Sequence, residues 1–330
     1  MTKTGEALTR RAVEAAAWAP SVHNTQPWSF GLGRDRIVVR ADAGRRLDVA
    51  DPDGREMLIS CGAALFTLET ALRAHGLVPD VRSLPDPDRP NLVADVRVRP
   101  GAPGDEAAAR LLREVPRRRT HRGVFREVPV EPGVLAALRL EAEREGAHLR
   151  QAVDVHTVGA LAALTQLAEH LRRLDPAHAA EAARWAPTPR STRTDGVPHT
   201  AYPRETPRST PDFAARDFAR GNGWGVPAET DETDLSPGLV FTLSTDGDTR
   251  ADWLNAGRAL QRVLLRAAAD ADLSAAFHTQ ALEIPELRAF VRTRFCNGDA
   301  PQMILRLGVP AGPELASVRR PLDAVVFDEP

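Results

Sequence analysis

Three neutral polar side chains follow one another in a short loop near the start of the chain. Ser21, Asn24 and Gln26 lie between Pro20 and Pro27. Hydroxyl and carboxamide groups donate and accept hydrogen bonds without carrying a charge. Such a set suits the edge of a flat heterocycle with mixed donors and acceptors, for instance a flavin, a nicotinamide or a nucleobase.

The run that contains these residues, APSVHNTQPW from Ala19 to Trp28, matches a known pattern. It resembles the APSxxNxQPW signature of the nitroreductase superfamily of FMN proteins, in the form found in its larger, Acg-type branch. The resemblance implies that the loop lies against a flavin. Ser21, His23, Asn24 and Gln26 are then the expected cofactor-binding residues. Without the resemblance, the loop would be interpreted as a helix C-terminus followed by a polar turn.

A second motif lies in the middle of the chain, where the run RRRTHRGVF extends from Arg117 to Phe125. It resembles the R-R-S-x-R-x-F opening of nitroreductase chains, with a threonine in place of the serine. Guanidinium groups bind phosphate through paired N–H donors, and a hydroxyl can add another. A solvated basic turn is the alternative for this cluster taken alone. The resemblance implies a site for the FMN phosphate made by Arg118, Arg119, Thr120 and Arg122.

Two weaker segments extend the resemblance. Arg319 and Arg320 precede a proline, at a place where the family carries basic residues that close on the same phosphate. Thr279 and Gln280 stand where other members place a Glu-Gly segment along the flavin ring, so the sequence departs from the pattern here. Helix capping before Pro285 remains an alternative for this second pair.

The composition is that of an ordinary globular protein. The chain has 330 residues, of which 42% are hydrophobic and 27% charged, and a formal net charge of −2, which argues against a broad nucleic-acid surface. Its longest apolar run is far shorter than the ~20 residues of a membrane span. The first residues lack a signal-peptide pattern. Neither the two cysteines nor the nine histidines show metal-ligand spacing. We expect a cytoplasmic protein without metal, membrane or nucleic-acid partners.

Helices and strands alternate along the chain. Apolar residues at helical spacing predict helices up to Trp18 and over 54–74, 131–145, 157–174, 251–271 and 285–294. Extended apolar runs predict strands near 29–32, 36–40, 92–98, 239–243 and 302–308. The mixture predicts an α+β fold with mixed sheets flanked by helices, which the resemblance makes nitroreductase-like.

Two of these helices share a pattern of small residues, in which Gly62 matches Gly257. Such helices can pack closely about a pseudo-twofold axis, although any two alanine-rich amphipathic helices look alike. Smaller nitroreductases are homodimers with FMN at the subunit interface. The resemblance therefore implies two fused halves in this chain, 1–116 and 117–330. We expect one FMN per chain, and a monomer or weak homodimer.

Residues 185–238 differ from the rest of the chain, because they are dense in Pro, Gly, Thr and Arg and lack sustained periodicity. Long segments of this kind within a domain are usually functional lids or linkers. Aromatic residues favour a packed segment: Trp185, Tyr202, Phe213, Phe218 and Trp224. We expect a lid, inserted in the second half, over the open face of the flavin.

The resemblance implies an oxidoreductase that moves hydride from NAD(P)H to FMN and on to a small aromatic, quinone or metabolite. Flavin chemistry resides in the cofactor, while the protein supplies binding, orientation and exclusion of water. We therefore name no catalytic residue. One alternative is a protein that stores or sequesters FMN under its lid with little turnover. Another, an RNA-binding module built on Arg117 to Arg122, is disfavoured by the net charge.

Overall fold

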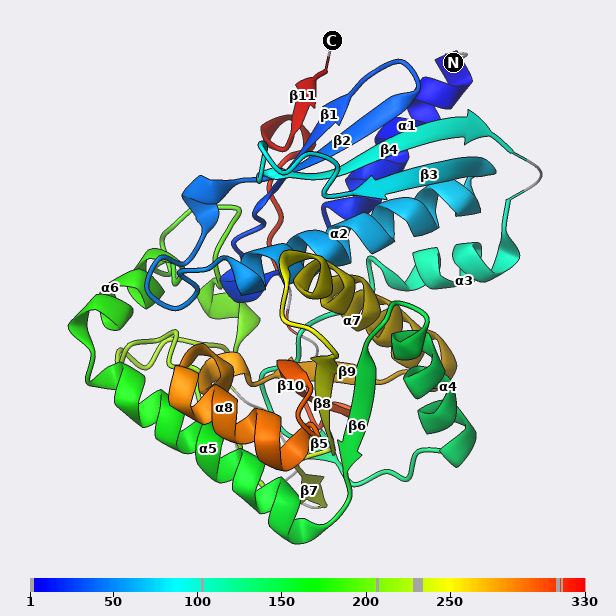
Figure 1. Ribbon diagram of the computed structural model, residues 1–330. Helices are drawn as coiled ribbons and strands as arrows, with labels where there is room; N and C mark the ends of the chain where they lie inside the picture. Colours follow the sequence, from blue (N-terminus) through cyan, green and yellow to red (C-terminus); the bar gives the residue numbers. More distant parts are fainter. Residues whose placement is uncertain are drawn as a thin grey trace.

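Two β-sheets lie on opposite sides of a layer of helices in the computed structural model (Figure 1). The central pair in this layer is α2 (Arg55–Ala74) and α7 (Arg250–Ala271), which lie side by side. The structure describes residues 3–101, 104–205, 208–227, 234–312, 315 and 317–329.

The first sheet has five strands in the order β11-β1-β2-β4-β3. Their bounds are Val326–Asp328, Trp28–Leu32, Arg36–Ala41, Leu92–Pro100 and Leu77–Ser83. Neighbours are antiparallel, except that β11 runs parallel to β1. Trp28, Phe30 and Ile37 form a buried core with Leu58 and Leu65 of α2, and α1 (Lys3–Ala16) packs beside α2. The C-terminal strand thus completes the sheet of the first half, which the sequence division at 116/117 does not anticipate.

The second sheet has four antiparallel strands in the order β6-β8-β10-β9. Their bounds are His148–Ala152, Leu239–Thr245, Ala300–Gly308 and Ser274–Phe277. Side chains such as Phe241 and Leu305 pack toward α7 and α4 (Pro132–Glu143). Their neighbours Val240 and Ile304 pack toward α5 (Val155–Arg173) and α8 (Pro285–Phe295). Helices therefore cover both faces, and β10 is buried at every position.

The remaining elements are shorter. They are α3 (Glu106–Glu114), α6 (Pro176–Arg184), β5 (Phe125–Arg126), β7 (Leu235–Ser236) and the 3-10 turns η1 (Val22–Asn24), η2 (Ala43–Arg45), η3 (His199–Ala201), η4 (Thr279–Glu283) and η5 (Leu322–Ala324). Every predicted helix and strand is present, whereas the helices α3 and α6 and the strands β3, β5, β6, β7, β9 and β11 were not predicted. The strand β3 was missed because Pro79 and Asp80 interrupt its apolar pattern. Both residues are tolerated there because β3 lies at the edge of the sheet.

Both sheets follow the same path along the chain. Each half runs helix, two strands, long helix and two strands, so that β1-β2-β4-β3 corresponds to β6-β8-β10-β9. We infer two equivalent halves, with α2 matched to α7. The strands β1 and β2 are joined by a short turn, while 86 residues, 153–238, separate the equivalent β6 and β8. The segment 185–238, called the insertion below, lies within this connection.

The backbones of α2 and α7 touch at two glycines. A Cβ atom added to Gly62 would lie 2.1 Å from the carbonyl oxygen of Leu254, and one added to Gly257 would lie 1.9 Å from that of Ile59. No side chain fits in either position. The close packing predicted from the shared small-residue pattern is therefore confirmed, and the pseudo-twofold relation remains an inference from the matching topology.

Among the described residues, one helix, α2, is long and apolar enough to cross a membrane by length and composition alone. In the 18-residue stretch of α2 that meets this criterion, 89% of the residues are buried inside the protein. The apolar character of α2 therefore follows from its central place in the core.

We expect Gly257→Ala to destabilise the protein by about 1–3 kcal/mol or more, because the helices must separate to admit the methyl group. The matched control is Gly159→Ala in α5, where an added Cβ meets nothing within 4 Å. That change should be neutral or stabilise the helix by about 0.5–1 kcal/mol. Denaturant unfolding followed by circular dichroism measures both. Equal midpoints for the two variants would contradict the close contact.

Candidate functional site

A cavity lies where the two halves meet, beside the first turns of α2. It has about 1110 Å³ of space free of protein atoms, part of which is open solvent. Its walls come from the loop before η1, from α2 and α7, from residues 120–122, from β9, η4 and β10, and from the insertion. Of the residues selected from sequence, Ser21, His23, Thr120, Arg122 and Thr279 line it.

The loop from Ser21 to Gln26 is fixed by two hydroxyl groups. The Ser21 hydroxyl oxygen accepts a hydrogen bond from the backbone N–H of Gln26 (3.0 Å). Ser60 of α2 accepts one from the backbone N–H of Val22 (3.1 Å). Ser60 also lines the cavity. The central helix therefore holds the loop at the cavity wall.

Within this loop, His23, Asn24 and Gln26 have positive φ angles of 44°, 53° and 50°. Non-glycine residues rarely adopt this conformation, and each instance costs on the order of 1–3 kcal/mol. It persists where surrounding contacts enforce it, and such positions cluster at functional sites. The loop geometry therefore depends on tertiary contacts rather than on local preference.

The side chains of Asn24 and Gln26, which we expect to bind the cofactor, do not line the cavity. The Asn24 amide donates to the carbonyl oxygens of Gly196 (2.8 Å) and Val318 (3.1 Å). The Gln26 amide donates to that of Thr194 (2.9 Å). Because these are backbone partners, the two side chains dock the insertion and the C-terminal segment onto the loop.

His23 faces the cavity instead. Neither of its ring nitrogens has a hydrogen-bond partner among the described residues. Its ring meets Phe218 of the insertion edge-on, with 5.6 Å between centroids. Burial, followed by the positive charge of Arg216, lowers its pKa well below the usual value. The imidazole is therefore neutral and offers one donor and one acceptor to a ligand.

Four arginines from distant parts of the chain gather near one another: Arg118, Arg119, Arg122 and Arg319. Burial, followed by the positive charges of the other three, lowers the pKa of Arg319 to about 9. Arg119 and Arg319 each lie over the ring of Trp18, 5.3 Å from its centroid. Within the described part of the chain, no carboxylate forms an ion pair with Arg119, Arg122 or Arg319. In this arginine cluster, the positive charges of Arg119, Arg122 and Arg319 are therefore not offset by an ion pair with a described residue, although all three guanidinium groups donate to backbone carbonyl oxygens.

The segment that supplies three of these arginines is held against the second sheet. Thr120 forms a β-bridge with Ala275 of β9, and the next backbone N–H, of His121, donates to the Ala275 carbonyl (2.7 Å). Arg122 donates to the carbonyl oxygen of Ala201 in the insertion (2.9 Å), and burial lowers its pKa to about 10. Arg122 therefore belongs both to the arginine cluster and to the lining of the cavity.

The two weaker predicted pairs lie apart from each other. Arg319 belongs to the arginine cluster, and its guanidinium donates to the Asn24 side-chain oxygen (3.1 Å) and to the Trp18 carbonyl (3.0 Å). Arg320 donates to backbone carbonyls and has Arg45, Asp42 and Asp195 as its charged neighbours. Thr279 lines the cavity, whereas Gln280 is fully buried, does not line it, and donates to the Ala214 carbonyl (3.3 Å). Cofactor contacts of these residues stay predictions.

Several cavity-lining residues were not selected from the sequence: Glu56, Ser60, His121, Arg216, His278 and Arg306. A signal existed for one of them. Arg55 and Glu56 are adjacent charges at the start of an otherwise apolar helix, and both side chains are buried. Ionisable residues on a buried helix are rarely without a specific partner or function.

Glu283 lies between two arginines near His23. It forms ion pairs with Arg172 and Arg216, and the Thr279 hydroxyl donates to it (2.9 Å). Burial opposes ionisation of Glu283, but the two arginines outweigh it and lower the pKa. Both arginines therefore have a carboxylate partner, although the single charge of Glu283 offsets only one of their two positive charges.

The insertion contributes aromatic side chains to the cavity wall. Tyr202, Phe213 and Phe218 line it and are largely buried. Trp224 packs in the same cluster as Tyr202 and Phe218 without lining the cavity. Trp185, at the start of the insertion, packs instead against Leu47 and Ala50 of the first half.

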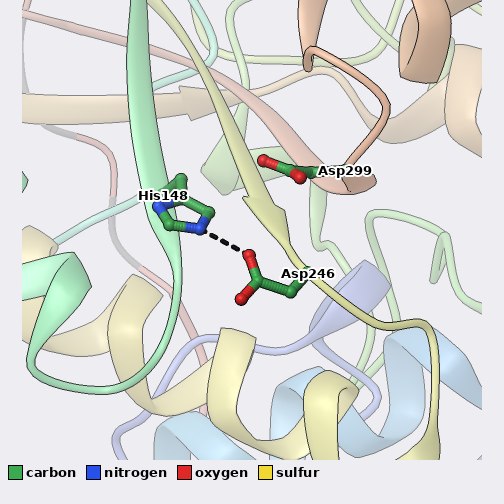
Figure 2. A group of neighbouring side chains, drawn as sticks. All are labelled: His148, Asp246 and Asp299. Carbon is green, nitrogen blue, oxygen red and sulfur yellow. Dashed lines mark hydrogen bonds and ion pairs between the residues drawn. The ribbon is translucent and has the colours of Figure 1, made fainter.

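One group of described residues has spacing compatible with a metal: His148 on β6, Asp246 after β8, and Asp299 before β10 (Figure 2). The His148 ring lies 2.7 Å from the Asp246 carboxylate. Arg150 pairs with Asp299 at 2.6 Å, and the Asp246 side chain is 86% exposed. Because a guanidinium already neutralises Asp299, we assign no metal to this group.

Comparison with known proteins gives relatives over nearly the whole chain. A Mycobacterium tuberculosis protein provisionally named NAD(P)H nitroreductase Rv3131 is 35% identical over 321 residues, 96% of this chain and 90% of the relative. The provisionally named NAD(P)H nitroreductase acg of the same organism is 31% identical over 324 residues, 96% of this chain and 94% of the relative. No model of a protein family matches the chain.

Among solved structures, a nitroreductase with bound FMN from Bacteroides fragilis is 13% identical. It superposes with a TM-score of 0.40 over 66% of this chain and 98% of the other. The family assignment rests on the full-length relatives and not on this structure. Since they exceed 30% identity over more than nine-tenths of the sequence, the chain belongs to the nitroreductase family, in the branch that contains acg.

Proposed function

We propose that this chain is an oxidoreductase that binds one FMN in the cavity and moves hydride from NAD(P)H to a small aromatic, quinone or metabolite acceptor. The observation that carries the proposal is the arginine cluster. Burial lowers the pKa of Arg122 and of Arg319, and neither these two nor Arg119 has a carboxylate partner among the described residues. A buried uncompensated charge is costly, so an anionic ligand group is the expected partner.

The remaining lining fits the rest of an FMN molecule. Ile59, Ala63 and Leu260 offer an apolar wall to a flat ring. Polar atoms without partners among the described residues include both His23 nitrogens and the Tyr202 hydroxyl. These suit the mixed donors and acceptors of a flavin edge. When bound, the flavin would supply the hydride chemistry, while the protein binds it, orients it and excludes water.

The insertion favours a second candidate function, in which the protein holds FMN with little turnover. Tyr202, Phe213 and Phe218 lie on the cavity wall, where they would restrict stacking of a substrate. Anaerobic stopped-flow mixing with NADPH separates the two functions. Rapid loss of the oxidised flavin absorbance supports the oxidoreductase, and its persistence supports sequestration.

The purified protein should be yellow, with one FMN per chain, because the Ser21 loop and the Arg117 motif each occur once. Visible absorbance together with the protein concentration gives the ratio. We expect a monomer to be sufficient, since both halves of the cavity belong to one chain. Two equivalent FMN molecules per chain would contradict this arrangement.

Arg122→Ala should weaken FMN binding by about 1.5–3 kcal/mol, or about 10- to 100-fold in Kd, and riboflavin binding much less. The reason is that riboflavin lacks the phosphate. Titration of flavin fluorescence with the apoprotein measures both affinities. Arg117→Ala is the matched control, since Arg117 belongs to the same motif but pairs with Glu114 at the surface. Equal losses for FMN and riboflavin would place the phosphate elsewhere.

Combined Tyr202→Ala and Phe218→Ala substitutions should accelerate reduction by NADPH several-fold if the insertion limits access to the flavin. Trp224→Ala is the control, because Trp224 packs in the same cluster without lining the cavity. Stopped-flow absorbance measures the reduction rate, with dithionite as a small reductant for comparison. A double variant that retains FMN but reacts no faster would show that the insertion is not a lid.

A further inference from the structure

The side chain of Asn24 binds two segments that are far apart in the sequence. Its amide group donates to the carbonyl oxygen of Gly196 in the insertion (2.8 Å) and to that of Val318 near the C-terminus (3.1 Å). Its side-chain oxygen accepts a hydrogen bond from the guanidinium of Arg319 (3.1 Å). One buried carboxamide therefore joins the insertion to the segment that carries Arg319.

Gln26 repeats this arrangement two residues later. Its amide donates to the carbonyl oxygen of Thr194 in the insertion (2.9 Å), and its side-chain oxygen accepts from the backbone N–H of Arg320 (2.8 Å). A carboxamide donates and accepts through separate atoms, so it can hold a carbonyl on one side and an N–H group on the other. The same two-sided contact at both positions indicates that the insertion and residues 317–320, called the C-terminal strap below, dock together.

The C-terminal strap is held by few buried contacts. Residues 317–320 form no helix or strand, and each of them is partly exposed. Such segments open locally at a small cost in free energy. Docking of the strap also brings Arg319 beside Arg118, Arg119 and Arg122, and burial followed by these like charges lowers the pKa of Arg319 to about 9. The docked position therefore has an electrostatic cost, which an anion bound among these arginines would remove.

We propose that Asn24 and Gln26 are positioning residues that couple the docking of the insertion to the phosphate group of the ligand. This inference rests on the function proposed above. An anion in the arginine cluster favours the docked strap, because Arg319 then has an opposite charge beside it. The docked strap orients both carboxamides, and their remaining N–H groups hold the carbonyls of Thr194 and Gly196. Occupancy of the phosphate end thereby fixes the insertion at the cavity wall.

The coupling makes the insertion respond to the phosphate and not to the flavin ring. FMN and riboflavin have the same ring, and riboflavin lacks the phosphate. FMN should therefore favour the docked insertion, whereas riboflavin should leave the insertion as it is in the flavin-free protein. Coupling between two sites is reciprocal, so docking of the insertion raises the affinity for FMN by the same factor.

Hydrogen–deuterium exchange followed by mass spectrometry measures the docking of both segments. In the parent protein, FMN should slow exchange of the backbone amides in 193–201 and 317–325 roughly 10-fold relative to the riboflavin-bound protein. Equal protection by the two ligands would overturn the inference while leaving the proposed function intact. Failure of the parent protein to bind FMN would overturn the proposed function, and this inference with it.

Gln26→Glu separates coupling from simple structural support. A glutamate carboxylate still accepts from the Arg320 N–H group, but it has no hydrogen to donate to the Thr194 carbonyl. FMN should therefore still protect 317–325 in this variant, and most of its protection of 193–201 should be lost. A purely structural role would instead lower the protection of 193–201 equally with FMN and with riboflavin. The difference between the two ligands is therefore the quantity to compare.

Gln261→Glu is the matched control, because Gln261 is a fully buried glutamine on α7 whose amide donates to the Thr67 hydroxyl of α2 (2.9 Å). This variant should keep the FMN-dependent protection of both segments. If Gln26→Glu does not fold, the comparison of FMN with riboflavin in the parent protein decides alone. A parent-level response of 193–201 in Gln26→Glu, or the same loss in Gln261→Glu, would overturn the coupling.

Discussion

The contact between the backbones of α2 and α7 at Gly62 and Gly257 determines how the two halves meet. Because no side chain separates the helices there, each contributes to the core of the opposite half. Ile59 of α2 packs in the second core, and Leu254 of α7 packs in the first. The first turns of α2 are thereby brought against β9 and β10, and the cavity with Glu56 on its wall lies at this junction.

Charge is distributed unevenly around this cavity. Near His23, Glu283 forms ion pairs with both Arg172 and Arg216. The arginine cluster has no such carboxylate for Arg119, Arg122 or Arg319 within the described residues. A buried cation without an anionic partner is unfavourable unless a ligand supplies the anion. This contrast is the basis on which we propose the arginine cluster as the site of a ligand's anionic group.

The insertion illustrates how an irregular segment acquires a fixed position. Its described residues form little regular secondary structure, so their backbone carbonyls need donors from elsewhere. The side chains of Asn24 and Gln26 supply two such donors, and the ion pair between Arg45 and Asp195 (2.8 Å) adds a charged contact. Residues that resemble ligand contacts by motif thus hold the insertion against the loop. Tyr202 and Phe218 of the insertion are in this way presented to the site.

The sequence by itself determined the long elements and the place of the two main motifs, because helical and strand periodicities are local properties of a chain. It also indicated the Gly62–Gly257 contact through the shared small-residue pattern. Only the tertiary structure decided which polar side chains face the cavity. The positive φ angles at His23, Asn24 and Gln26 set the direction of those side chains. They arise from contacts with segments near residues 195 and 318, and no local pattern encodes such distant partners.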